Sequence, residues 1–90
     1  MKIMLKQFGT ILTSRPAGRD AYTETKSNIL PLRAEQIIEI DFSGVKVLSP
    51  GWADEFLTPI KNEFGKNFIL LPIDNSSVKA SLEILEQQHK

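Results

Sequence analysis

An alternation of short apolar runs with helix-like segments constrains the fold of this chain more than any other feature. Two runs, "QIIEIDF" (36–42) and "NFILLPI" (67–73), have the short, β-branched or apolar character of buried strands. Between them lies "SPGWADEFLTPIKNEFG" (49–65), in which apolar residues recur at helical spacing. Strands that are joined through helices form parallel sheets covered by those helices. The pattern therefore predicts an α/β domain.

The central helix carries clear start and stop signals. Ser49 suits the N-cap, Pro50 the first helical position, and Gly65 the C-terminal stop. Pro59 removes one interior backbone hydrogen bond, at a cost of about 3 kcal/mol, so we expect a kink near this residue. The predicted buried face comprises Trp52, Ala53, Phe56, Leu57, Ile60 and Phe64.

The N-terminal part predicts two further kinds of element. Residues 3–5 and 10–13 are short apolar runs around a glycine, which predicts a strand pair or one bent strand. A helix is then expected from a Ser14 cap to Pro31, because the residue before a proline avoids helical angles. Its partial apolar stripe comprises Ala21, Tyr22, Ile29 and Leu30.

The C-terminal part predicts a last helix that is capped by Asn75 or Ser76. Its inner face would hold Val78, Leu82 and Leu85, and residues 87–90 are expected to fray. Residues 1–90 are thus expected to form a single domain. We expect an α/β fold with a mostly parallel or mixed sheet of about four strands, covered by about three helices.

Composition excludes several functional classes. Basic and acidic residues balance at eleven each, so there is no electrostatic case for a nucleic acid or an anionic membrane. The apolar runs are far shorter than the roughly 20 residues that span a bilayer. The first residues lack the apolar region of a signal peptide, so a cytoplasmic location is expected. With no cysteine, there is no thiolate nucleophile and no cysteine-based metal site.

The stretch "DFSGVKVLSPGWADEFL" (41–57) resembles the STAS domain of anti-sigma-factor antagonists, and most closely its offshoot, the STAS-like domain of unknown function. The residues that carry this likeness are Ser14-Arg15, Asp41-Phe42, Gly44-Val45 and Ala53-Asp54-Glu55. The order and spacing of the elements fit from about Phe8 to Leu85. The resemblance implies a STAS-like fold and a regulatory role in bacterial signalling.

The antagonist motif is only half present. Its first part, Asp-x-Ser-x-Val, is matched by Asp41, Ser43 and Val45. Its second part, Asp-Ser-Ser/Thr-Gly, contains the residue that a partner kinase phosphorylates. Here those positions hold Ser49, Pro50, Gly51 and Trp52. Gly51 has no hydroxyl group, so a phosphorylation switch cannot operate there and would have moved to Ser49 or Ser43.

Several of these residues admit a structural and a functional interpretation. Ser49 is a helix cap or a phosphoacceptor. Ser14-Arg15 is a cap followed by a solvated or ion-paired arginine, or a phosphate-binding pair. Asp41 caps the loop that turns at Gly44, or it faces a ligand at the sheet edge.

The helix start raises the same question. Asp54 and Glu55 are not expected to work as a catalytic acid–base pair, because adjacent helical residues diverge by about 100° and no base is evident. They are instead expected to complement the helix dipole or to contact a partner. Gly51 would permit close approach of a partner backbone. Trp52 belongs to the core or, if it is accessible, anchors an interface.

These observations favour a non-catalytic regulatory module that binds a partner protein. The partner that the resemblance implies is an ATPase of the histidine-kinase type, and homo-oligomers are possible. The expected contact residues are Ser14, Arg15, Ser49, Gly51, Trp52, Asp54 and Glu55. The alternative is a small nucleotide- or anion-binding domain without turnover. No enzyme, cofactor or metal site is expected, because the one histidine, His89, lies in the tail and no phosphate-binding glycine loop is present.

Overall fold

A computed structural model of the chain describes residues 1–28 and 35–88. Three α-helices and five short strands make up these parts, with two 3-10 turns between them. In chain order they are β1 (Lys2–Met4), η1 (Leu5–Phe8), β2 (Ile11–Leu12), α1 (Arg15–Asn28), β3 (Ile38–Asp41), β4 (Val47–Leu48), α2 (Pro50–Phe64), η2 (Gly65–Asn67), β5 (Phe68–Leu70) and α3 (Ser76–Gln88). The predicted α/β class is confirmed.

The strands form two small sheets. The larger has the order β1-β3-β5, and the smaller pairs β2 with β4. All three pairings are parallel, with Ile3 beside Ile40 and Ile40 beside Leu70 in the larger sheet. The predicted N-terminal strand pair is wrong, because the 3-10 turn η1 separates β1 from β2 and sends them to different sheets. Each strand therefore pairs with a later part of the chain.

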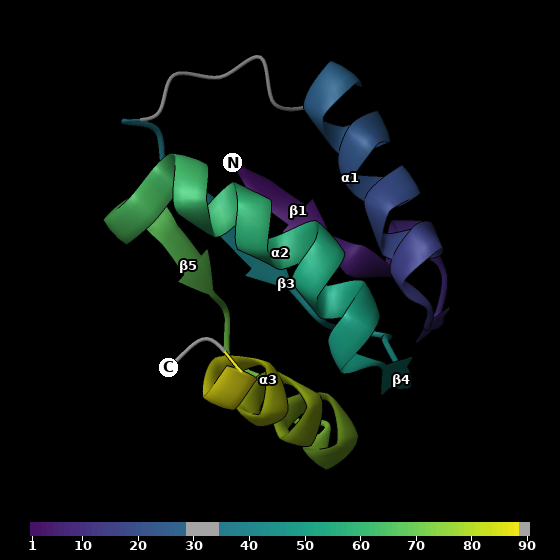
Figure 1. Ribbon diagram of the computed structural model, residues 1–90. Coiled ribbons are helices and arrows are strands. Elements are labelled where there is room, and N and C mark those ends of the chain that lie inside the picture. The colour runs from purple at the N-terminus through teal and green to yellow at the C-terminus, as the bar shows by residue number, and fades with distance from the viewer. Residues whose placement is uncertain (29–34, 89–90) are drawn as a thin grey trace.

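The helices cover one face of the larger sheet. Figure 1 shows α2 crossing in front of β1 and β3, with α1 beside it on one side and α3 on the other. Alternate residues of the strands point at α2 and are buried, as Ile3, Ile38 and Ile40 show. They pack in one core with Phe56 and Ile60 of α2. The predicted buried face of α2 is confirmed in full.

β5 differs from the expected buried strand. It lies at the edge of the larger sheet, where Ile69 and Leu70 are 40% and 41% exposed. The apolar run in the sequence predicted the strand correctly but not its position, because strand order depends on long-range pairing. Ile69 also projects to the face opposite α2, in register with the half-buried Glu39.

The helix boundaries follow the predicted signals in most cases. α2 begins after a Ser49 cap and ends at Gly65, with Pro59 inside it. α3 is capped by the Asn75 side chain, whose Oδ1 accepts from the Ser77 and Val78 amides at 2.8 and 3.2 Å. α3 continues to Gln88, and the rest of the tail that was expected to fray lies outside the described residues.

Other expectations fall outside the described residues. These are the Pro31 helix stop, the contributions of Ile29 and Leu30 to the stripe, and the tail position of His89. Within residues 1–28 and 35–88, none of the helices has the length and apolar character needed to cross a membrane.

Candidate functional site

The starts of α1 and α2 meet at two glycines. A Cβ atom on Gly18 of α1 would come within 2.6 Å of the Trp52 carbonyl oxygen. A Cβ atom on Gly51 of α2 would come within 2.9 Å of the Arg15 Cγ atom. Neither position can hold a larger residue without a shift, so the absence of a side chain at each one lets the two helices approach closely.

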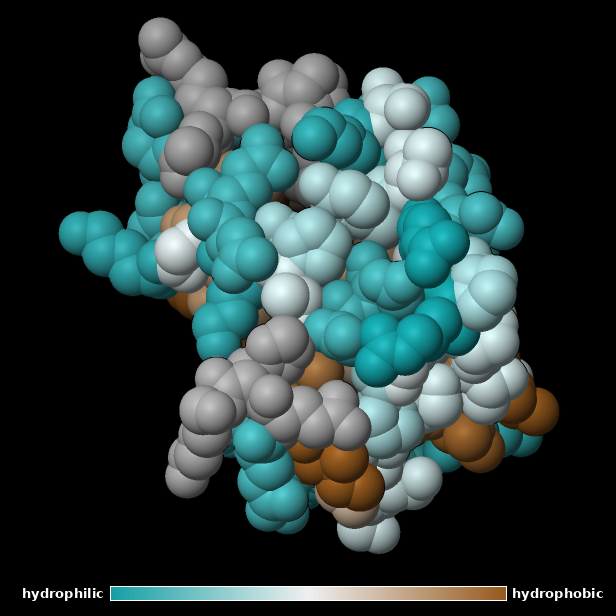
Figure 2. All heavy atoms as spheres, in the orientation of Figure 1, coloured by the Kyte–Doolittle hydropathy of each residue, from teal (hydrophilic) through white to brown (hydrophobic). Residues whose placement is uncertain are grey.

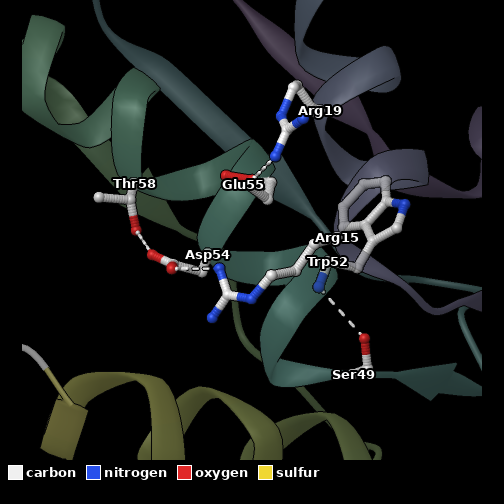
Figure 3. A network of polar contacts seen from close by, with 7 residues as sticks. All are labelled: Arg15, Arg19, Ser49, Trp52, Asp54, Glu55 and Thr58. Atoms are coloured by element: carbon white, nitrogen blue, oxygen red, sulfur yellow. Dashed lines mark hydrogen bonds and ion pairs between the residues drawn. The ribbon is translucent and has the colours of Figure 1, made fainter.

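Two ion pairs cross the same helix contact, as Figure 3 shows. Arg15 Nη1 donates to Asp54 Oδ2 at 2.8 Å, and Arg19 Nη2 donates to Glu55 Oε1 at 2.7 Å. The two arginines lie one helical turn apart on α1, which places them opposite adjacent carboxylates on α2. Thr58 Oγ1 also donates to Asp54, at 2.8 Å. The four charged groups therefore hold the two helices together.

This arrangement changes the interpretation of the carboxylates. No acidic residue lies in the first turn of α2, so Asp54 and Glu55 do not complement the helix dipole as expected. Each is instead directed at an arginine of α1. The pKa of Arg15 is raised, mainly by its hydrogen bond to Asp54, so this cation stays charged. The plain interpretation of Arg15 as an ion-paired residue is confirmed.

Trp52 belongs to the core, which was one of its two alternatives, and it does not anchor an interface. Its side chain is 2% exposed. Its ring stacks on Phe56 at a centroid distance of 4.9 Å, and Phe8 lies 6.1 Å from it. The aromatic cluster therefore belongs to the core under the helix contact.

The start of α2 uses its own polar groups locally. Ser49 Oγ accepts from the Trp52 amide at 3.1 Å, and the Ser49 carbonyl accepts from the Ala53 amide at 3.1 Å. Pro50 has no amide hydrogen, and the Arg15 stem occupies the space above Gly51. Gly51 therefore admits a side chain of its own chain rather than a partner backbone. Among the described residues, the anion-binding alternative gains no supporting observation here.

The loop between β3 and β4 is held by Asp41. Its Oδ1 accepts from the Ser43 amide at 2.8 Å, and Lys2 Nζ lies 3.7 Å from its Oδ2. The Ser43 hydrogen bond is the main cause that lowers the pKa of Asp41, and Lys2 adds to it. Gly44 then turns the chain at a φ of +85°, a conformation that favours glycine. Both residues have the structural role that was one of the alternatives.

Ser14 caps α1 with its Oγ, which accepts from the Ala17 amide at 3.3 Å. Its φ of +77° is unusual for a residue with a side chain, and it lies between the end of β2 and the start of α1. Ser14 and Arg15 are both exposed. The cap interpretation of this pair is therefore confirmed.

An exposed apolar pair beside these loops was missed from the sequence. Ile11 of β2 and Val47 of β4 lie side by side in register and are 64% and 40% exposed. Figure 2 shows hydrophobic surface at the corner where Figure 1 places β4. The alternation within "TILT" and "KVLS" could have indicated it, because Leu12 and Leu48 must point inward and their neighbours outward.

The predicted cap residue Asn75 and Ser81 of α3 fix the other side of this corner through contacts that the sequence did not indicate. Asn75 Nδ2 donates to the carbonyls of Val45 and Lys46, both at 3.2 Å. The buried Ser81 hydroxyl donates to the Leu48 carbonyl. β4 and the residues before it are therefore held by pairing with β2 and by hydrogen bonds from Asn75 and Ser81. These contacts fix the backbone that carries the exposed Ile11–Val47 pair.

No three histidine, cysteine, aspartate or glutamate side chains of the described parts come together as a metal site. A search of curated proteins gave no match, and neither did a search of solved structures. The model of one protein family, the STAS-like domain of unknown function, matches residues 26–78. The match covers more than half of the chain and includes β3, the Asp41 loop and the whole of α2. The chain therefore belongs to the family of STAS-like domains of unknown function.

Proposed function

We propose that this protein is a non-catalytic regulatory module that binds a partner protein through one corner of the fold. We name this surface the β2–β4 face, and its residues are Ile11, Thr13, Ser14, Lys46, Val47 and Ser49. The observation that carries the proposal is the exposed Ile11–Val47 pair. Apolar side chains ringed by polar ones are typical of the centre of a protein interface.

The rest of the corner supports the same use. The exposed Ser14, Lys46 and Thr13 provide a polar rim around the apolar pair. Ser49 lies at the end of β4 and is half-buried. Asp54 and Glu55 are not part of this face. Their carboxylates fix α1 against α2 through ion pairs with Arg15 and Arg19.

The partner that we propose is an ATPase of the histidine-kinase type, as the resemblance to anti-sigma-factor antagonists implies. The complex would then form in the cytoplasm of a bacterium and serve signalling. At the antagonist phosphoacceptor position this chain has Gly51, over which the Arg15 stem lies. Binding would therefore not be controlled by phosphorylation at that position.

A relocated switch has two candidate sites. Ser43 is exposed in the loop after β3, whereas the Ser49 oxygen is occupied as the α2 cap. A phosphate on Ser49 would have to displace the Trp52 amide from that oxygen, so Ser43 is the more accessible of the two. Mass spectrometry after incubation with the ATPase and ATP shows directly whether Ser43 or Ser49 is phosphorylated. If the chain stays unmodified, binding is constitutive and is not controlled by phosphorylation.

Calorimetry with an ATPase of the histidine-kinase type as the partner tests the proposal. Ile11→Glu places a charge in the centre of the β2–β4 face without touching the core, so we expect affinity to fall at least tenfold, or about 1.4 kcal/mol. The matched control is Ile37→Glu, because Ile37 is also exposed but precedes β3 at the other end of the strands. Equal affinity of both variants and the wild type would remove this face as the binding site.

A further inference from the structure

We propose that two copies of this chain associate through the free edge of β5 and form one continuous sheet. Within the described residues, β5 has a single strand neighbour, β3. Its three residues are all apolar, and Ile69 and Leu70 are exposed on opposite faces of the sheet. Edge strands that stay unpaired are usually very short or carry charge, proline or a bulge. β5 is short, with three residues, but it carries no charge, proline or bulge, so its edge is open to pairing with another strand.

The backbone of β5 shows which groups are available. The Leu71 amide donates to the Ile40 carbonyl at 3.0 Å, so Leu71 faces β3. Because strand residues alternate, the N–H and C=O of Leu70 point to the free edge. The Phe68 amide already donates to the Gly65 carbonyl, which leaves the Phe68 carbonyl as the other outward acceptor. The Leu70 N–H is thus an available donor, and the Phe68 C=O, two residues earlier, is a matching acceptor.

An antiparallel second copy satisfies both groups when the pairing centres on Ile69. The Leu70 amide of each copy then donates to the Phe68 carbonyl of the other. A register centred on Leu70 would place Pro72, which has no amide hydrogen, opposite Phe68. The Ile69 register is therefore the one that the backbone supports, and it places the two Ile69 side chains face to face in a non-hydrogen-bonded pair.

The surroundings of β5 favour a second copy of the chain as the occupant. A groove of about 590 Å³ lies between α2, β5 and α3. Its apolar lining consists of Leu57, Phe68, Leu70, Leu82 and Leu85. In the Ile69 register, Phe68 of one copy lies beside Leu70 of the other on this same face, so the second copy brings apolar side chains to the groove.

The charges at the ends of β5 match those of an antiparallel copy. Lys66 precedes the strand, Asp74 follows it, and both are exposed. Neither takes part in the three salt bridges found among the described residues. Antiparallel pairing brings Lys66 of one copy toward Asp74 of the other at both ends of the interface. This surface is separate from the β2–β4 face, so the two proposals can fail independently.

Sedimentation velocity of the full chain over a range of concentrations tests the association. We expect a species of twice the single-chain mass for the wild type, and a single-chain species for Leu70→Pro, which removes the outward amide. Ile69→Lys places two like charges face to face and should have the same effect, with the fold checked by circular dichroism. Ile84→Lys, at an exposed α3 position outside the groove lining, is the matched control and should stay dimeric.

A cross-link tests the register. The chain has no cysteine, so Ile69→Cys introduces one thiol per copy. Directly opposite residues in such a pair have Cα atoms about 4.5 Å apart, within the about 4.4–6.8 Å range of disulfides. We expect mild oxidation to yield a covalent dimer from Ile69→Cys and much less from Ile84→Cys. A wild type that stays a single chain at high concentration, or a dimer that Ile69→Lys and Leu70→Pro leave intact, would overturn the proposal.

Discussion

Gly18 of α1 lies against the Trp52 backbone of α2 so closely that a Cβ atom on Gly18 would be 2.9 Å from the Trp52 Cα atom. This contact sets the distance between the two helices. It also fixes where Arg15 and Arg19 stand relative to the two carboxylates of α2. The glycine that weakens α1 as an isolated helix is therefore what allows α1 to dock.

Gly18→Ala should destabilise the protein. In a helix without neighbours this change is stabilising by about 1 kcal/mol. Here the added methyl group meets backbone atoms, which cannot move as a side chain can, so we expect a loss of about 1–3 kcal/mol in the free energy of unfolding. Urea denaturation measures it, with the exposed Asp20→Ala as a control on the same helix. Unchanged or increased stability of Gly18→Ala would contradict the close packing.

The ion pair between Arg15 and Asp54 should show a favourable coupling energy in a double-mutant cycle. The cycle consists of Arg15→Ala, Asp54→Ala and the double variant, each measured by urea denaturation. The Arg15 side chain is half exposed, so the coupling is expected to be small and to weaken as salt is raised. A coupling that is zero at low salt would mean that the pair does not hold the helices.

Gly51→Ser tests why the antagonist hydroxyl is missing. The new Cβ atom would lie 2.9 Å from Arg15 Cγ, so the arginine must move and its pair with Asp54 is disturbed. We expect a loss of about 1 kcal/mol in stability. In an Arg15→Ala background the same substitution should be nearly neutral, because the obstructing stem is gone. Equal costs in both backgrounds would show that Arg15 does not restrict this position.

The lowered pKa of Asp41 leads us to expect that the free energy of unfolding decreases in acid. Its pKa is lower in the folded chain than its ordinary value of 3.8, so its ionised form is stabilised by folding. This contribution is fully present above the ordinary value and is lost as the pH falls through the lowered, folded-state pKa. Asp41→Asn removes the charge but keeps an acceptor for the Ser43 amide.

The comparison of wild type and Asp41→Asn across a series of pH values measures that contribution. The wild type should be more stable near neutral pH, and the two chains should converge in strong acid. A stability difference that does not change with pH would mean that the charge of Asp41 contributes nothing to folding.

The sequence predicted those features that depend on contacts between residues close together in the chain. The Ser49 cap, Pro50 and Gly65 delimit α2 through contacts within a few residues, and Asn75 begins α3 in the same way. The buried face of α2 also follows from spacing alone. The Ser14 cap and the Asp41 loop also depend on hydrogen bonds to residues close in the chain, so both were among the predicted alternatives.

Features that depend on distant residues could not be predicted in this way. Arg15 and Asp54 are separated by 39 positions, and nothing in either neighbourhood indicates the other. The edge position of β5 depends on which strands become neighbours in the larger sheet. The separation of β1 from β2 has the same origin, because both strands pair with segments that follow much later.

The most direct test of the central claim is an NMR titration of the labelled protein with an ATPase of the histidine-kinase type, the partner class that we propose. If the β2–β4 face is the binding surface, the amide signals of Ile11, Lys46, Val47 and Ser49 should shift or broaden first, while those of β5 and Ile84 stay in place. No change on addition of the ATPase, or changes that centre on β5 while Ile11 and Val47 are unaffected, would contradict the account.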